Sequence, residues 1–211
     1  MHRDIQVTSR FAWKQAAKYG SIKPDIIRAD WHAAPIMCGG ITLYSPLKKY
    51  GAEGKHVGIV GLGRLGHFGV LFAKALGALK ITVVSRWRAK EDDAKKLRAD
   101  HFIAADEEGW EQGDNASSLD LIVSTVLSDK LPLDLFPAFP AVALIMKAVH
   151  ITGSAIGSPK DIKEMLQLVS EKGIKPWTQE VSLKHTNKAI LDFENGKPRY
   201  RFVLKNENYS G

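Results

Sequence analysis

Short apolar runs alternate with longer segments of helical pattern through the middle of the 211-residue chain. Residues 56–60 ("HVGIV") form a continuous apolar run that is typical of a buried strand. Residues 65–78 are apolar on most faces, which predicts a buried helix that stops at Gly77. The alternation continues with predicted strands at 80–84, 101–105 and 119–126 and a predicted polar helix at 89–100. This order predicts an α/β fold with a Rossmann-like, doubly wound parallel sheet.

Two later segments differ in how clearly their pattern predicts secondary structure. Residues 141–154 are ambiguous by period, and a fifth strand at their end is one interpretation. A helix is predicted after Ser158, which can act as the N-cap, with Pro159 at the first helical position and Asp161 at capping-box spacing. Gly173 is expected to end it. The apolar face of this helix would consist of Ile162, Met165, Leu166 and Val169.

Composition narrows the class of protein. Hydrophobic residues make up 45% and charged residues 25%, which suits a soluble chain of one domain, or one domain with an appendage. A single cysteine, Cys38, excludes an internal disulfide and favours a reducing compartment, so we expect a cytoplasmic location. The first thirty residues show no signal-peptide pattern, and no apolar stretch is long enough to predict a membrane span.

The net charge of +7 raises the question of an anionic partner. Lysines and arginines are scattered rather than massed, and no nucleic-acid motif is present, so nucleic acid is not expected as a partner. A basic surface without a dedicated partner and a small phosphorylated ligand remain as interpretations.

The first candidate binding site is a glycine-rich turn. Gly61, Gly63 and Gly66 form a G-x-G-x-x-G motif between the strand at 56–60 and the following helix. In this context the three glycines allow a tight turn, close approach of a pyrophosphate and close helix–strand packing. A glycine-rich turn without a ligand is the alternative. Candidate contacts also lie between the glycines, at Arg64, which could reach a phosphate or solvent, and at Leu65.

The end of the second strand indicates which dinucleotide would bind. An NAD site usually carries an acidic residue there to hold the ribose 2′-hydroxyl. Here the position holds Ser85, followed by Arg86, with Lys90 a turn further on. A hydroxyl and two cations suit a 2′-phosphate, so the residues favour NADP(H). The alternative is that these cations and Arg88 form a solvated helix start.

Several segments in order resemble the zinc-dependent medium-chain alcohol dehydrogenases, in their NADP-dependent cinnamyl alcohol dehydrogenase-like branch. The resemblance runs from about Ala33 to Leu204 and rests on "AAPIMCGGITLYSPLKKYG", "GIVGLGRLGH", "FAKALGA", "VVSRWRAKEDDAKKLRADHFIA", "IGSPKDIKEMLQLVSEKGIKPW" and "YRFVL". It implies an oxidoreductase that transfers hydride between NADP(H) and a primary alcohol or aldehyde.

The resemblance also assigns residues around the metal and the nicotinamide. Cys38 matches a ligand of the catalytic zinc, and Thr42 matches a threonine near the nicotinamide, which makes it the catalytic candidate. The other zinc ligands and the structural zinc loop of the family have no counterpart, because His2, His32 and His67 stand in other contexts. Since a catalytic zinc needs three protein ligands, we expect Cys38 to be orphaned and zinc not to bind tightly.

Further matches concern the cofactor and the partner copy. Ser124 and Thr125 match positions near the adenosine ribose, and Ser154 and Ile156 match a strand beside the nicotinamide. A late basic contact would come from Arg201, or from Arg199. Pairing of edge strands near this nicotinamide-side segment implies a homodimer.

The predicted organisation is that of a truncated family member. Residues 1–32 form a poorly matched N-terminal segment, residues 33–186 the NADP-binding domain, and residues 187–211 a return to a remnant of the catalytic domain. Whether the chain is itself an enzyme stays open at this point. It could be an NADP(H)-dependent alcohol dehydrogenase or aldehyde reductase, a non-catalytic NADP(H)-binding protein, or a repurposed catalyst without metal.

Overall fold

The computed structural model describes residues 33–110, 112–115, 118–126, 150–198 and 200–207. The predictions for the N-terminal segment, for residues 141–149 and for Arg199 lie outside these residues. In the described part of the chain, no helix is both long enough and apolar enough to cross a membrane.

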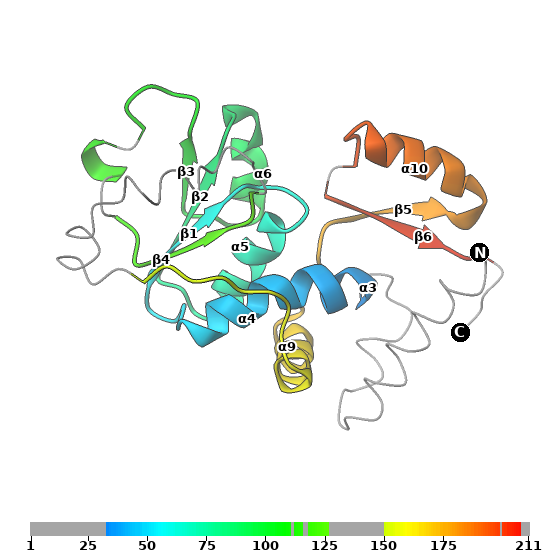
Figure 1. Ribbon diagram of the computed structural model, residues 1–211, viewed down its shortest axis with the longest axis horizontal. Helices are drawn as coiled ribbons and strands as arrows, with labels where there is room; N and C mark the ends of the chain where they lie inside the picture. The colour runs from blue at the N-terminus through cyan, green and yellow to red at the C-terminus, as the bar shows by residue number, and fades with distance from the viewer. Residues whose placement is uncertain (1–32, 111, 116–117, 127–149, 199, 208–211) are drawn as a thin grey trace.

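Four parallel strands form the main sheet, in the order β3-β2-β1-β4 (Figure 1). Val57 of the central strand lies opposite Ile81 on one side and Leu121 on the other. The predicted α/β fold with a parallel sheet is therefore confirmed. The strands are β1 (His56–Val60), β2 (Lys80–Ser85), β3 (His101–Ala104) and β4 (Leu121–Ser124).

All three helices predicted from the sequence are present. The helix after β1 ends before Gly77, whose φ of 81° suits glycine. The helix after β2 ends earlier than residue 100, because Arg98 takes a left-handed conformation with φ of 66°. The helical elements up to residue 172 are α3 (Ala33–Pro35), the π-helical turn η1 (Ile36–Gly40), α4 (Ile41–Lys49), α5 (Gly66–Ala75), the 3-10 turn η2 (Arg88–Lys90), α6 (Glu91–Lys96), the 3-10 turn η3 (Gly113–Asn115) and α9 (Pro159–Lys172).

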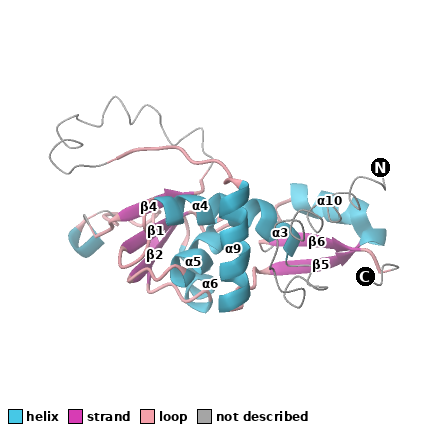
Figure 2. Ribbon diagram, turned by 90° about the horizontal axis from the view of Figure 1, so that it is seen from below, coloured by secondary structure: helices cyan, strands magenta, loops and turns pink. Residues whose placement is uncertain are grey.

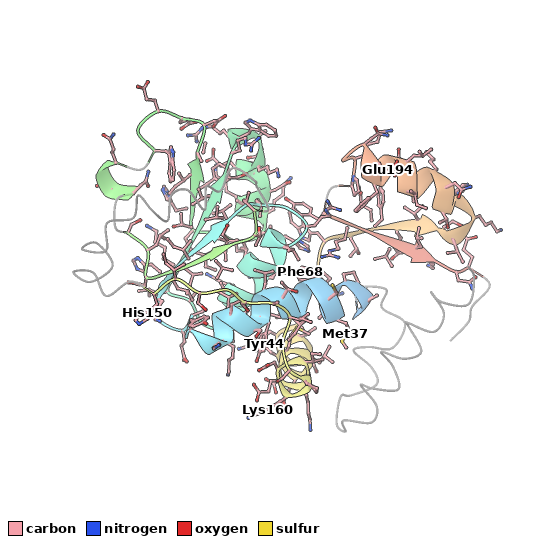
Figure 3. The ribbon with its side chains drawn as sticks, in the orientation of Figure 1. Met37, Tyr44, Phe68, His150, Lys160 and Glu194 are labelled. Carbon is pink, nitrogen blue, oxygen red and sulfur yellow. The ribbon has the colours of Figure 1, made fainter. Side chains whose placement is uncertain are left out.

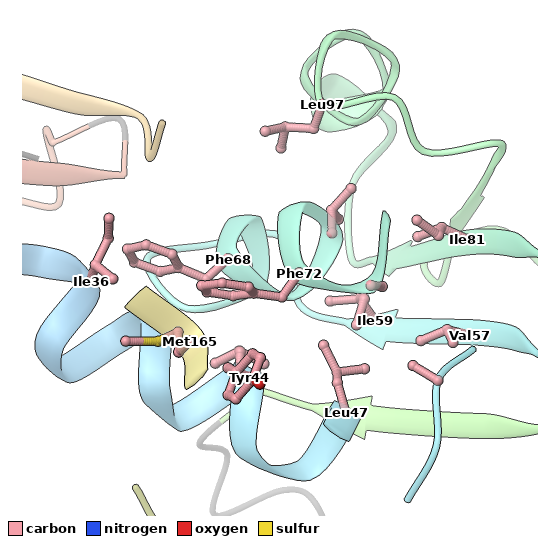
Figure 4. Packing of buried hydrophobic residues seen from close by; sticks show 14 of the residues in the cluster. Ile36, Tyr44, Leu47, Val57, Ile59, Phe68, Phe72, Ile81, Leu97 and Met165 are labelled. Carbon is pink, nitrogen blue, oxygen red and sulfur yellow. The ribbon is translucent and has the colours of Figure 1, made fainter. Parts of the chain in front are cut away.

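Helix α4 and α5 pack together through aromatic side chains that are fully buried. The rings of Tyr44 and Phe72 meet edge to face with centroids 5.6 Å apart, and Phe68 stacks on Phe72 at 6.3 Å. Met165 of α9 belongs to the same core (Figure 4). Tyr44 and Phe68 lie within this packed region, whereas Lys160 at the start of α9 points away from it (Figure 3). This core holds the helix of the glycine-rich turn in place.

The capping of α9 confirms the prediction made for it. Ser158 Oγ accepts the N–H of Asp161 at 3.2 Å, and Asp161 Oδ2 accepts the N–H of Ser158 at 2.7 Å. The Ser158 hydroxyl also donates to Asp161 Oδ2 at 2.6 Å. This bond, together with the one from the Ser158 N–H, lowers the pKa of Asp161, because both favour its charged form. Gly173 closes the helix with φ of 61°. The inward face is the predicted one, with Ile162 partly buried and Met165, Leu166 and Val169 buried.

A small second sheet follows in the last part of the chain. Its two strands are parallel, and a helix connects them, beside the larger sheet (Figures 1 and 2). One strand precedes residue 187, where a domain boundary is expected, and the other follows it. The position of that boundary stays a prediction. The elements are β5 (Thr178–Ser182), the 3-10 turn η4 (Leu183–His185), α10 (Thr186–Glu194) and β6 (Arg201–Lys205).

A fifth strand at the end of residues 141–154 is not present in its described part. Residues 150–157 contain no strand. Ile151 is 50% exposed and Ile156 57% exposed, so this segment offers no buried apolar face. Ile156 also has φ of 46°, which is incompatible with an extended strand.

A buried hydrogen bond joins the second sheet to α6. The hydroxyl of Tyr200 donates to Asp93 Oδ2 at 2.8 Å, and the two residues are 6% and 4% exposed. The Tyr200 ring also packs against His67 and Trp177. Strand β6 is thereby held against the helix that follows the second strand.

Replacing Tyr200 with phenylalanine should lower the free energy of unfolding by about 1–3 kcal/mol, since a buried carboxylate loses one hydrogen bond while the ring contacts stay. Urea unfolding with an unchanged m-value would measure the loss. Tyr50→Phe is the matched control, because its hydroxyl contact to Thr152 is exposed. We expect that variant to stay within about 0.5 kcal/mol of the wild type. Equal losses in both variants would contradict the role given to Tyr200.

Candidate functional site

The glycine-rich turn lies where β1 ends and α5 begins. Gly61 has φ of 91°, and its N–H donates to the carbonyl of Val84 in β2 at 2.8 Å. A Cβ on Gly66 would lie 1.8 Å from the Gly61 carbonyl oxygen, whereas a Cβ on Gly63 would meet no atom within 4 Å. Gly61 and Gly66 therefore shape the turn, and Gly63 leaves its backbone open to a ligand.

Thr125 fixes this turn from the neighbouring strand. Its hydroxyl lies 3.0 Å from the carbonyl oxygen of Val60 and 2.9 Å from that of Gly61, so it shares its proton between the two. Its N–H also donates to the Val60 carbonyl at 2.9 Å. The sequence placed Thr125 near a ribose. The structure places its hydroxyl on the backbone of the turn.

The turn leads directly into the positive end of a helix. Leu65 is the N-cap of α5, and its side chain forms no capping hydrogen bond. The first turn of α5 carries no acidic residue. A helix N-terminus with this composition favours a negatively charged ligand.

Cationic side chains border the turn at the end of β2. Ser85 is the last residue of that strand and is 6% exposed, and Arg86 beside it is exposed. The ammonium of Lys90 donates to the carbonyl of Leu62 at 2.7 Å, which brings it onto the glycine-rich turn. Lys90 is thus placed on the glycine-rich turn, while Ser85 and Arg86 lie at the end of the adjacent strand.

Arg88 is set apart from these cations by its own partners. It donates to both carboxylate oxygens of Glu107 and, at 2.9 Å, to Glu91. These hydrogen bonds raise the pKa of Arg88, and the bonds to Glu107 have the largest effect. Within the described residues, ion pairs form at Arg88 but not at Arg86 or Lys90. Arg88 is thus already paired, whereas the choice between a 2′-phosphate site and a solvated helix start stays a prediction for Arg86 and Lys90.

Strand β6 brings a further arginine to the turn. Nε of Arg201 donates to the carbonyl of Arg64 at 3.3 Å, and the Arg201 guanidinium lies directly against Gly39. Burial lowers the pKa of Arg201. The guanidinium of Arg64 stacks over the ring of Phe193 in α10 at 4.3 Å. The sequence pointed to Arg64 and Arg201 separately, and it had no signal for Phe193.

Cys38 and Thr42 lie together on the helical segment that precedes the sheet. Cys38 is exposed, and the Thr42 hydroxyl donates to the Cys38 carbonyl at 2.7 Å. Among the described residues, no three His, Cys, Asp or Glu side chains come close enough together to hold a metal ion. The residues described thus do not fit a catalytic zinc site, and Cys38 alone cannot form one.

The remaining predicted contacts lie at exposed positions. Ser124 ends β4 and pairs in register with Val60. Ser154 and Ile156 lie in the exposed segment without a strand. The structure brings Ser124 to the strand ends near the turn, while no described contact joins Ser154 or Ile156 to it.

His67, which the sequence analysis considered only as a zinc ligand, lies directly under the turn. It is fully buried between Phe68 and Tyr200, with ring centroids 4.2 Å and 5.1 Å away. Nδ1 lies 3.2 Å from the Gly63 carbonyl oxygen, and Nε2 has no hydrogen-bond partner among the described residues. Burial, as the largest cause, lowers its pKa to about 4.

A parallel sheet in this order, with a glycine-rich turn between its central strand and a helix, defines a domain of the Rossmann type. No protein-family model matches the chain. Individual proteins do match it. NADP-dependent alcohol dehydrogenase 6 of Saccharomyces cerevisiae is 39% identical over 196 residues, which covers 82% of this chain and 54% of that protein. A probable cinnamyl alcohol dehydrogenase 6 of Arabidopsis thaliana is 39% identical over 83% of this chain and 54% of that protein.

Solved structures lead to the same family. A cinnamyl alcohol dehydrogenase of Sorghum bicolor matches with a TM-score of 0.70 and 32% identity, over 82% of this chain and 54% of that one. A cinnamyl alcohol dehydrogenase of Helicobacter pylori, solved with NADP(H), matches with a TM-score of 0.67 and 27% identity, over 85% of this chain and 56% of that one. The chain therefore belongs to the medium-chain alcohol dehydrogenase family, in its cinnamyl alcohol dehydrogenase-like branch. It spans about half the length of the curated relatives it matches.

Proposed function

We propose that the chain binds NADP(H) and serves an oxidoreductase that transfers hydride between NADP(H) and a primary alcohol or aldehyde. The observation that carries the proposal is the open backbone at Gly63 in a turn that the ammonium of Lys90 contacts at Leu62. The printed names of relatives support the choice of cofactor, since one is NADP-dependent and another was solved with NADP(H).

The residues of the turn divide the work of binding. Backbone N–H groups near Gly63 and the N-terminus of α5 would hold the pyrophosphate. Arg86 and Lys90 would hold the 2′-phosphate as charged donors, with the Ser85 hydroxyl beside them. Lys90 already contacts the Leu62 carbonyl at 2.7 Å, so it ties the phosphate pocket to the turn. The bound cofactor supplies the hydride chemistry.

Other parts of the assignment rest on the resemblance. Thr42 is proposed near the nicotinamide, and small alcohols or aldehydes are proposed as substrates. The described residues build no site for zinc, so no residue is assigned to it. A homodimer and a cytoplasmic location stay predictions. Additional proposed cofactor contacts are Arg64, Leu65, Ser124, Thr125, Ser154, Ile156 and Arg201.

The cofactor assignment predicts that the protein binds NADPH more tightly than NADH. Arg86→Gln should weaken NADPH binding by about ten- to a hundredfold, the equivalent of one charge-assisted hydrogen bond, and leave NADH binding unchanged. Calorimetric titration would measure both constants. Arg88→Gln is the control, because Glu91 and Glu107 already occupy Arg88. Equal affinity of the wild type for both cofactors would refute the assignment.

Hydride transfer is tested separately from binding. We expect the whole chain to oxidise NADPH when an aromatic or aliphatic aldehyde is added. A parallel assay with a chelator shows whether the reaction depends on metal. Tight NADPH binding without turnover of any aldehyde would leave a non-catalytic NADP(H)-binding protein as the function.

A further inference from the structure

Trp87 is a large apolar side chain left in solvent at the end of β2. It is 57% exposed and is not part of the hydrophobic core. Its backbone is extended, with φ of −118° and ψ of 139°, and it precedes η2 directly. An exposed indole lacks the stabilisation that burial of its apolar surface would give. An exposed tryptophan beside the proposed 2′-phosphate site therefore suggests a role in ligand binding.

The neighbours of Trp87 are the residues proposed to hold the 2′-phosphate. The Arg86 guanidinium lies over the indole ring at 5.5 Å, and the N–H of Lys90 donates to the Trp87 carbonyl at 3.4 Å. A cation–π contact uses none of the N–H donors of a guanidinium, so these donors can still reach a phosphate. The indole therefore orders Arg86 without consuming its donors.

The chemistry of the ligand places its base near this ring. In a 2′-phosphorylated adenosine, the phosphate and the base are carried by adjacent carbons of one ribose. If Arg86 and Lys90 hold that phosphate, the base lies within a few ångströms of the residue between them. Trp87 is the aromatic side chain in that interval.

We propose that the indole of Trp87 is the stacking platform for the adenine of the dinucleotide. This inference rests on the proposed NADP(H) site and adds the residue that recognises the base. With Arg86 over one face of the indole, the base packs on the other. Stacking involves no 2′-phosphate, so Trp87 contributes equally to the binding of NADPH and NADH, whereas Arg86 distinguishes them.

The test compares Trp87→Ala and Trp87→Phe with Trp110→Ala, a second exposed tryptophan that is 37% exposed. The ligands are NADPH, NADH, adenosine 2′,5′-bisphosphate and nicotinamide mononucleotide. Trp87→Ala should weaken the three adenine ligands by the same factor, roughly tenfold, and leave the mononucleotide unchanged. Trp87→Phe should retain most of the affinity, and Trp110→Ala all of it.

Fluorescence offers a second readout. Adenosine 2′,5′-bisphosphate should change the indole emission of the wild type and of Trp110→Ala, and this change should vanish in Trp87→Phe. Unaltered affinities in Trp87→Ala, with NADPH still bound by the wild type, would overturn the stacking alone. A wild type that binds none of the adenine ligands would overturn the proposed cofactor site, and the stacking with it.

Discussion

Gly66→Ala is expected to lower the free energy of unfolding by about 3 kcal/mol or more and to abolish measurable NADPH binding. Two effects compete at this position. Alanine in place of glycine inside a helix ordinarily gains about 1 kcal/mol from propensity. A Cβ 1.8 Å from the Gly61 carbonyl oxygen cannot be accommodated, because the atom it meets is backbone. The clash therefore outweighs the propensity, and relieving it must move the turn that would hold the pyrophosphate.

Gly63→Ala is the matched control, since it makes the same chemical change three residues earlier. Its Cβ would meet no atom within 4 Å, so the unfolding free energy should stay within about 1 kcal/mol of the wild type. NADPH binding should nevertheless weaken at least about tenfold, because the methyl group fills the space where the phosphate approaches. Chemical denaturation and cofactor titration of both variants separate fold from binding. A Gly66→Ala protein as stable as the wild type would contradict the close contact between Gly66 and Gly61.

The elements that sequence analysis predicted well are those whose signals are local. The capping box of Ser158 and Asp161 lies within four residues, and the structure forms it as expected. The helical segment before β1 was not predicted, because Gly39, Gly40 and Pro46 are poor helix formers. That segment is held by tertiary packing instead, with Tyr44 against Phe72. Propensity is a weak guide where an aromatic core decides the outcome.

The candidate site also contains parts that the sequence predicts and parts that it does not. The turn at Gly61 could be predicted from the sequence, because a positive φ between a strand and a helix requires glycine at that point in the chain. The contacts that close the site are distant in sequence. Tyr200 reaches Asp93 across 107 positions, and Arg201 reaches Arg64 across 137. Such contacts depend on the path of the second sheet, which no local pattern in the sequence determines.

His67 should make the protein lose stability as the pH falls below about 6.5. Burial lowers its pKa from 6.5 to about 4, while the Gly63 carbonyl opposes this shift only in part. Above pH 6.5 the histidine is neutral in both the native and the unfolded state, so its contribution is fully present. At lower pH the unfolded state takes up a proton that the native state resists, and the loss approaches about 3 kcal/mol near pH 4.

Denaturation of the wild type and of His67→Phe between pH 4 and 8 isolates this contribution, because the carboxylates affect both proteins equally and cancel in the difference. The wild type should lose stability relative to the variant as the pH falls. His185→Gln, at an exposed position of η4, should follow the wild type. A stability difference that does not change with pH would show that His67 is hydrated rather than buried.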